Sequence, residues 1–275
     1  MDFKYCDKLI KDFLQVVEQP VLAKGATYYT GVDLGTACVV ICVLNEVGEP
    51  VAGAYRYADV VRDGMVVDYM GAIQIVREMK QELEEKLGAE LFSAAAAIPP
   101  GTDLLDSGAI KNVVESAGFE IDCILDEPTA ANEVLKIQNG AIVDIGGGTT
   151  GISIIKGGQV VHVSDEPTGG THFSLVVSGA YKLPYDEAEL FKRDYQNHKE
   201  LIGVLKPVIE KVASIVSHHI RGHEVQEILL VGGTACLSGI EAIIAEKTGV
   251  FTRKPENPMF VTPLGIALSC KNSKV

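Results

Sequence analysis

The chain has 275 residues, of which 47% are hydrophobic and 22% charged, and its formal net charge is −13. This size allows two domains, and the composition predicts packed cores rather than disorder. The negative charge argues against a nucleic-acid-binding surface and a polybasic membrane contact, because both need clustered positive charge. No apolar run approaches the roughly 18 residues that span a bilayer.

The N-terminal segment is expected to form an amphipathic helix. Apolar residues recur at helical spacing from Phe3 to Val17, and Pro20 ends the pattern. Such a helix either braces the main body or binds a partner. The segment mixes charged with apolar residues and lacks the apolar core of a signal peptide, which predicts a cytoplasmic protein.

The rest of the chain predicts two runs of strands and helices. In the first half we expect a hairpin over 29–42, strands over 51–57, 93–98 and 121–125, helices over 68–87 and 102–117, and a helix that opens at Glu127. In the second half we expect a hairpin over 141–155, strands over 159–163 and 227–231, and helices over 169–180, 185–218 (broken near 203–207), 238–247 and 262–270.

The six cysteines show no metal-binding spacing and are expected to be reduced and mostly buried. They are Cys6, Cys38, Cys42, Cys123, Cys236 and Cys270. Cys38 and Cys42 could share one face of a strand, but two thiolates alone make a poor metal site.

Two stretches of the chain nearly repeat each other. Asp33 and Asp144, 111 residues apart, each end an apolar run and precede a glycine-rich turn with threonine and a second β-branched run. A glycine turn lets backbone amides approach a phosphate, and the aspartate can hold a hydrated Mg²⁺ against it. Two such hairpins facing each other would clamp a nucleotide. The alternative is that each aspartate only caps its own turn.

The order of elements repeats with the hairpins. Each half runs hairpin, third strand, helix, strand and helix, which predicts an α/β protein of two similar lobes with mixed sheets and a cleft between them. The expected division is a leader over 1–25, a first lobe over 26–141 plus 259–275, and a second lobe over 142–258.

Five segments in this order resemble the actin, Hsp70 and sugar-kinase ATPase superfamily. They are GVDLGTA, LDEPTAA, VDIGGGTTGISI, ILLVGGTACLSGI and FVTPLGIALS. Within that superfamily the chain is most similar to the ethanolamine utilisation protein J family, through ADVVRDGMVVDYMGAIQIVR, IPPGTD and DEPTGGTHFSL. The resemblance implies two RNase H-like lobes with an interlobe nucleotide cleft and no large inserted subdomain.

The resemblance also implies roles for acidic residues in ATP or ADP binding with Mg²⁺. Asp33 and Asp144 would hold Mg²⁺ through water, and Asp144 would also orient the attacking water. Glu127 would reach the shell of metal-bound water and couple hydrolysis to lobe rotation. Its alternative is a first-turn acid stabilised by the helix dipole.

Further residues would contact the nucleotide by the same resemblance. The phosphate-binding backbone would come from Gly35, Thr36 and Ala37 in the first turn and from Gly146, Gly147, Gly148 and Thr149 in the second. Gly232, Gly233 and Thr234 would pass under the adenosine. Glu189 and Lys192 would hold ribose and adenine, with Arg193 stacking on the ring, although a surface ion pair has the same helical spacing.

Two departures from the superfamily pattern predict slow catalysis. Ala37 and Cys38 stand where actins carry a phosphate-reaching lysine. The segment between the third strand and Ser93 is one helix, too short for the Hsp70 insertion that carries another. Mg²⁺ and backbone amides would then supply most of the charge stabilisation. No C-terminal substrate-binding domain is expected.

The family resemblance implies a role in ethanolamine catabolism. It implies a chaperone or reactivating factor associated with ethanolamine ammonia-lyase and with the bacterial microcompartment. The functional hypothesis is a slow ATPase whose lobe closure regulates an enzyme partner. The alternatives are a non-catalytic nucleotide-binding scaffold or filament protein, and a small-molecule kinase with Asp144 or Asp165 as its base.

Overall fold

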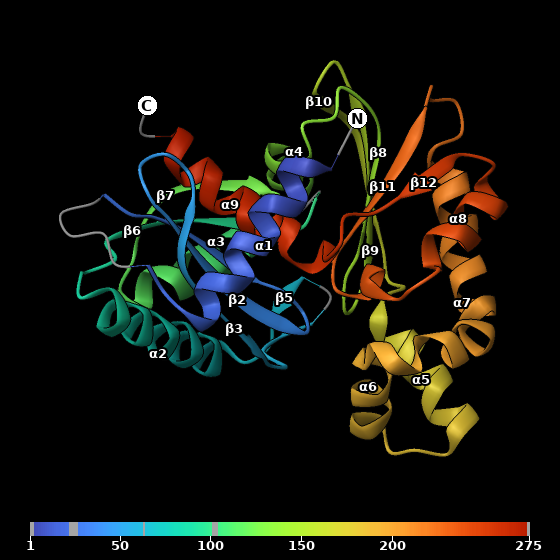
Figure 1. Ribbon diagram of the computed structural model, residues 1–275, viewed down its shortest axis with the longest axis horizontal. Helices are drawn as coiled ribbons and strands as arrows, with labels where there is room; N and C mark the ends of the chain where they lie inside the picture. The colour runs from blue at the N-terminus through green and yellow to red at the C-terminus, as the bar shows by residue number, and fades with distance from the viewer. Residues whose placement is uncertain (1–2, 22–26, 63, 101–103, 274–275) are drawn as a thin grey trace. The chain divides into compact units, whose positions relative to one another are not determined.

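The computed structural model describes residues 3–21, 27–62, 64–100 and 104–273, with side chains described for all of these except 104–107. Residues 101–103, within the IPPGTD motif and at the start of the helix expected over 102–117, lie outside this part. The chain divides into two compact units, Met1–Lys136 with Phe260–Val275 (unit 1) and Ile137–Met259 (unit 2). Both are mixed α/β, as expected, and most of their elements are labelled in Figure 1.

Unit 1 is built on a five-stranded mixed sheet. Its elements are α1 (Lys4–Glu18), β1 (Tyr29–Leu34), β2 (Cys38–Leu44), β3 (Pro50–Tyr57), β4 (Val61–Arg62), β5 (Met65–Val66), α2 (Tyr69–Leu87), β6 (Ser93–Ile98), α3 (Leu104–Ser116), β7 (Glu120–Asp126), α4 (Glu127–Leu135) and α9 (Val261–Asn272). The strand order is β3-β2-β1-β6-β7, with β1 antiparallel to β2 and parallel to β6.

Helices cover both faces of this sheet. Apolar side chains of β1, β2 and β6 form one core with α2 and α3. On the other face, Ala95 and Ala97 of β6 pack with Ala130 of α4 and with Ile266 and Cys270 of α9. The strands therefore read as continuous apolar runs, because both faces are buried.

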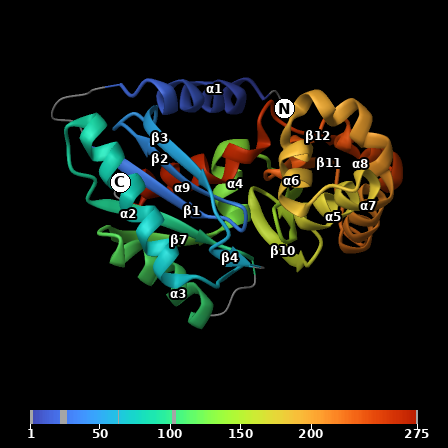
Figure 2. The ribbon, with the colours of Figure 1, turned by 90° about the horizontal axis from the view of Figure 1, so that it is seen from below.

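The N-terminal helix packs on the protein's own sheet. Figure 2 shows α1 lying along β3, and its buried side chains include Phe13, which has no exposed surface. The Phe13 ring lies against Gly53 of β3, and its centroid is 5.2 Å from that of Phe260. The apolar stripe of α1 is thus used within unit 1, as expected of a brace.

Unit 2 repeats the sheet of unit 1. Its elements are β8 (Asn139–Ile145), β9 (Thr150–Lys156), β10 (Gln159–Glu166), α5 (Gly170–Tyr181), α6 (Tyr185–Arg193), α7 (His198–His219), β11 (Glu227–Val231), α8 (Ile240–Thr248) and β12 (Phe251–Arg253). The strand order is β10-β9-β8-β11-β12, and β11 is parallel to β8 and β12. Its core joins β8, β9 and β11 to α5, α6, α7 and α8.

The two hairpins have the same register. Asp33 pairs with Val40 in the first hairpin, and Asp144 pairs with Gly151 in the second. All four positions keep the offset of 111 residues found in the sequence. The predicted fold class, two sheet-based lobes with no large insertion, is confirmed.

Several predicted boundaries were wrong. The break expected near 203–207 lies instead at Asp194–Asn197, and Pro207 sits inside α7. The buried stripe of α7 continues on both sides of Pro207, and its burial outweighs the roughly 3 kcal/mol cost of proline in a helix. A division at 141/142 would cut β8, whereas the units divide after Lys136, whose φ of 54° ends α4.

Short strands escaped the sequence analysis. Three strands, β4, β5 and β12, span only two or three residues each. An alternation of apolar and polar residues cannot be recognised over so few positions. Among the described residues, all six cysteines are free, and no helix combines the length and apolar character needed to cross a membrane.

Candidate functional site

The second glycine turn joins β8 to β9 in unit 2. The Gly146 amide donates to the Thr149 carbonyl at 3.0 Å, which closes a tight turn over Gly147 and Gly148. The first turn is built in the same way, since the Gly35 amide donates to the Cys38 carbonyl at 3.1 Å. The sequence repeat is therefore also a repeat of turn geometry.

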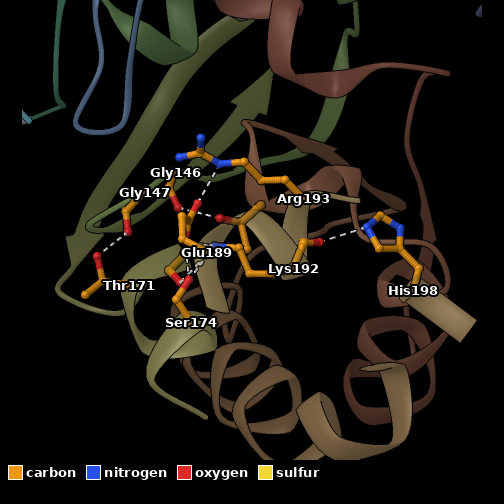
Figure 3. Close-up of polar contacts among 10 residues, drawn as sticks. Gly146, Gly147, Thr171, Ser174, Glu189, Lys192, Arg193 and His198 are labelled. Atoms are coloured by element: carbon orange, nitrogen blue, oxygen red, sulfur yellow. Dashed lines mark hydrogen bonds and ion pairs between the residues drawn. The ribbon is translucent and has the colours of Figure 1, made fainter. Parts of the chain in front are cut away.

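The start of α5 and Thr234 hold the carbonyls of the second turn. The Gly146 carbonyl accepts from the Gly170 amide at 2.9 Å and from the Thr234 hydroxyl at 2.7 Å. The Gly147 carbonyl accepts from the amide of Thr171 at 2.8 Å and from its hydroxyl at 3.0 Å, a contact drawn in Figure 3. The two amide donors, of Gly170 and Thr171, are among the orphan N–H groups that a helix N-terminus leaves for capping.

The same contacts orient the amides of the turn. In a trans peptide the C=O and the next N–H point in opposite directions. Holding the carbonyls of Gly146 and Gly147 against α5 therefore turns the amides of Gly147 and Gly148 the other way. Neither amide has an acceptor among the described residues. Paired free amides in a glycine turn suit an anion.

Two further glycines let α5 approach the turn. A Cβ on Gly169 would lie 2.6 Å from the Gly148 carbonyl carbon, and one on Gly170 would lie 2.5 Å from the Thr234 hydroxyl oxygen. A side chain at Gly169 would push the start of α5 away from the backbone of the turn, and one at Gly170 would displace the Thr234 hydroxyl. The glycines of the DEPTGG segment thus allow α5 to pack on the second glycine turn.

The predicted acids lie at the carboxyl edges of their sheets. Asp33 is near the end of β1, and Glu127 directly follows β7 on the same edge, because β1, β6 and β7 are parallel. Asp144 is near the end of β8, and Gly232 directly follows its parallel neighbour β11. Ligands of α/β sheets bind at this edge.

Glu127 opens α4, and the residue before it caps the helix. The Asp126 carboxylate accepts from the Thr129 amide at 2.9 Å and from its hydroxyl at 2.8 Å. Sequence reasoning missed this cap, although D-E-P-T carries the signal of an N-cap acid followed by a first-turn proline. Because Asp126 fulfils the capping role, Glu127 is not required for it.

The predicted adenosine residues form a buried network in unit 2. The Lys192 ammonium donates to the Gly170 carbonyl at 3.0 Å, to the Ser174 hydroxyl at 2.9 Å and to the Glu189 carboxylate at 2.7 Å (Figure 3). Arg193 donates to the other Glu189 oxygen at 2.7 Å. The three ammonium protons are all used, so Lys192 joins α6 to α5 and does not reach outward.

Burial and charge act against each other in this network. Burial alone would raise the pKa of Glu189, but Lys192, Ser174 and Arg193 outweigh it and hold that pKa below its usual value. Burial lowers the pKa of Lys192, and the facing Glu189 carboxylate opposes that change. The pair is the buried, hydrogen-bonded alternative to the exposed ion pair considered from the sequence.

A buried histidine holds the end of α6. The His198 Nδ1 accepts from the Ser238 amide at 3.1 Å, and Nε2 lies 3.1 Å from the Lys192 carbonyl. An amide only donates and a carbonyl only accepts, which fixes the neutral Nε2–H tautomer. Burial lowers the pKa of His198. The sequence carried no signal for this role, because Ser238 lies 40 residues from His198 along the chain.

The site residues fit a polyphosphate better than a bare metal. Among the described residues, no group of three or more His, Cys, Asp or Glu could hold a metal ion. Mg²⁺ needs no such cage, since it keeps several waters and is bound by one or two carboxylates with substrate phosphates. Asp33 in unit 1 and Asp144 in unit 2 each place one carboxylate beside the glycine turn of its own unit, which is the kind of ligand Mg²⁺ takes.

Comparisons with known proteins agree with this architecture. A family model described as type IV pilus assembly protein PilM matches residues 128–259. The ethanolamine utilization protein EutJ of Salmonella typhimurium is 44% identical over 252 residues, which cover 91% of this chain and 88% of that protein. The chain belongs to the EutJ family.

Two solved structures show which fold this chain shares with known proteins. The crystal structure of EutJ from Carboxydothermus hydrogenoformans matches with a TM-score of 0.92 at 46% identity, covering 98% of this chain and 99% of that one. MreB5 of Spiroplasma citri, solved bound to ADP, matches with a TM-score of 0.71 at 20% identity over 90% of this chain and 98% of that one. The chain therefore has the fold that the EutJ and MreB5 structures share.

Proposed function

We propose that this member of the EutJ family binds ATP with Mg²⁺, hydrolyses it slowly, and uses the bound nucleotide to control its affinity for an enzyme of ethanolamine utilisation. The observation that carries the proposal is the second turn, whose carbonyls are held by α5 and Thr234 while the amides of Gly147 and Gly148 are left without acceptors in the described structure. Thr36 and Ala37 occupy the same turn positions in unit 1.

Each group has a chemical role in this proposal. The turn amides bind phosphate oxygens, and Asp33 and Asp144 accept from metal-bound water. Mg²⁺ would neutralise phosphate charge when bound. Asp144 orients the attacking water, and Arg193, at the surface end of the Glu189 network, stacks on the base. Catalysis is slow because Ala37 and Cys38 offer no cation to the phosphates.

Titration calorimetry tests nucleotide binding. We expect ATP and ADP to bind with Mg²⁺ and to bind much more weakly with EDTA. Asp33→Asn and Asp144→Asn should each weaken Mg²⁺-ATP binding at least tenfold, whereas Asp165→Asn should bind like the parent. Absence of any nucleotide binding by the parent, or unchanged binding by both turn variants, would remove the assignment.

The proposed partner follows from the family. We propose ethanolamine ammonia-lyase, with a chaperone or reactivating role in the cytoplasm or at the microcompartment. ATP and ADP differ by the γ-phosphate, and a ligand shifts an equilibrium only through its differential affinity for the two states. Glu127→Ala should bind ATP but lose the ATP/ADP difference in affinity for the lyase. If the parent binds the lyase equally well in ATP, ADP and nucleotide-free buffer, the nucleotide does not control this affinity. The alternative of a non-catalytic scaffold would then be favoured.

A further inference from the structure

Thr234 lies where two distant segments of unit 2 meet. It follows β11, is 7% exposed, and its hydroxyl donates to the Gly146 carbonyl at 2.7 Å. The Gly170 amide donates to the same carbonyl at 2.9 Å. A carbonyl oxygen has two lone pairs, so these two donors complete its hydrogen bonding.

This carbonyl controls a phosphate-facing amide. The Gly146 C=O and the Gly147 N–H belong to one planar peptide, so rotating one rotates the other. Glycine on both sides of that peptide places few limits on its rotation. One donor leaves the plane free to swing about the hydrogen bond, whereas two donors from different segments fix it.

The hydroxyl proton of Thr234 is already used. A threonine hydroxyl has one proton to donate, and here the carbonyl of Gly146 accepts it. The packing enforces this arrangement, because a Cβ on Gly170 would lie 2.5 Å from the Thr234 hydroxyl oxygen and 3.1 Å from the Lys192 nitrogen. The bare Gly170 lets both side chains close on the turn.

We propose that Thr234 is a positioning residue for phosphate binding rather than a contact to adenosine. Its hydroxyl fixes the Gly146–Gly147 peptide so that the Gly147 amide is aimed at a phosphate oxygen before the nucleotide arrives. Thr234 thus selects for nucleoside di- and triphosphates over adenosine. The inference rests on the proposed nucleotide binding and deepens it.

The experiment compares ligands with and without phosphates. Thr234→Val removes the hydroxyl at nearly constant shape, and Thr234→Ser keeps the donor. Affinities for ATP, ADP and adenosine are measured with Mg²⁺ by calorimetry, with adenosine also measured by competition. Thr234→Val should lose about tenfold in ADP and ATP affinity, the effect of one hydrogen bond. It should bind adenosine like the parent, and Thr234→Ser should recover most of the loss.

Two results would contradict the proposed role of Thr234, and each differs from a failure of nucleotide binding. An equal loss for adenosine and ADP would make Thr234 an adenosine contact, and unchanged ADP affinity would show that α5 alone fixes the turn. Either result overturns the inference while leaving nucleotide binding intact. A parent that binds no nucleotide overturns both. If Thr234→Val does not fold, Thr234→Ala is measured with the same three ligands, and the same outcomes apply.

Discussion

The carboxylate of Asp144 lies against the Cα of Gly232, within the space that any side chain at position 232 would occupy. Gly232 also has a φ of +89°, and its amide donates to the Pro258 carbonyl at 3.1 Å. The glycine after β11 was expected to make room for adenosine. The structure shows a different role, because the absence of a side chain at Gly232 makes room for the carboxylate of Asp144 from the neighbouring strand.

Gly232→Ala should therefore lose both stability and nucleotide binding. The positive φ alone costs about 1–2 kcal/mol for a residue with a Cβ, and the added methyl displaces the Asp144 carboxylate. Gly233→Ala is the matched control for stability, because a Cβ there meets nothing within 4 Å and its φ is −64°. Urea unfolding of both variants and ATP titration of Gly232→Ala provide the measurement. Equal stability of the two variants, or ATP affinity of Gly232→Ala like that of the parent, would contradict the prediction.

The Glu189–Lys192 pair should show strong energetic coupling. Lys192→Met leaves the Glu189 carboxylate with Arg193 and Ser174 but without its buried ammonium. Removing one partner of a buried pair costs about 3–5 kcal/mol. In the Glu189→Gln background the same change should cost at least about 1 kcal/mol less. A double-mutant cycle in urea measures this coupling, and additive effects would show that the two residues act independently.

Stability should depend on pH through His198. Burial holds its folded-state pKa below the ordinary value of 6.5. As pH falls through that value, the unfolded chain takes up a proton that the folded protein refuses, so the free energy of unfolding decreases. His198→Gln should flatten the decrease between about pH 7 and 5, and exposed His218→Gln should not. Urea midpoints across that range test this, and a slope unaltered in His198→Gln would refute it.

Phe13 should anchor α1 to unit 1. Its ring is fully buried against Gly53 and Phe260, and truncating such a phenylalanine costs about 3–5 kcal/mol. Tyr5→Ala, on the same helix but 52% exposed, should change stability by about 0.5 kcal/mol or less. Urea unfolding of both variants measures the two free energies of unfolding. A small effect of Phe13→Ala would favour a helix held free for a partner.

The turns were predictable from sequence because their signal is local. Asp33 and Asp144 each stand beside glycines within a few residues, between two apolar runs that form the paired strands. Thr171 and His198 were not predictable, since their meaning lies in contacts to Gly147 and to the end of α6. Lys192 shows the limit most clearly. Its spacing from Glu189 fits a surface pair, a ligand contact or a buried brace, and only tertiary packing separates these three.

The placement of α9 has a consequence for synthesis on the ribosome. Unit 2 is one continuous segment, Ile137–Met259, whereas unit 1 needs Phe260–Val275 to be complete. From Val261 to Leu268 every residue of α9 is buried, and Gly31 of β1 lies directly against its backbone. Domains usually fold in order of emergence, N-terminal first. Here unit 2 has all its parts before α9 is made, whereas unit 1, although it begins earlier, is completed only when α9 has left the exit tunnel.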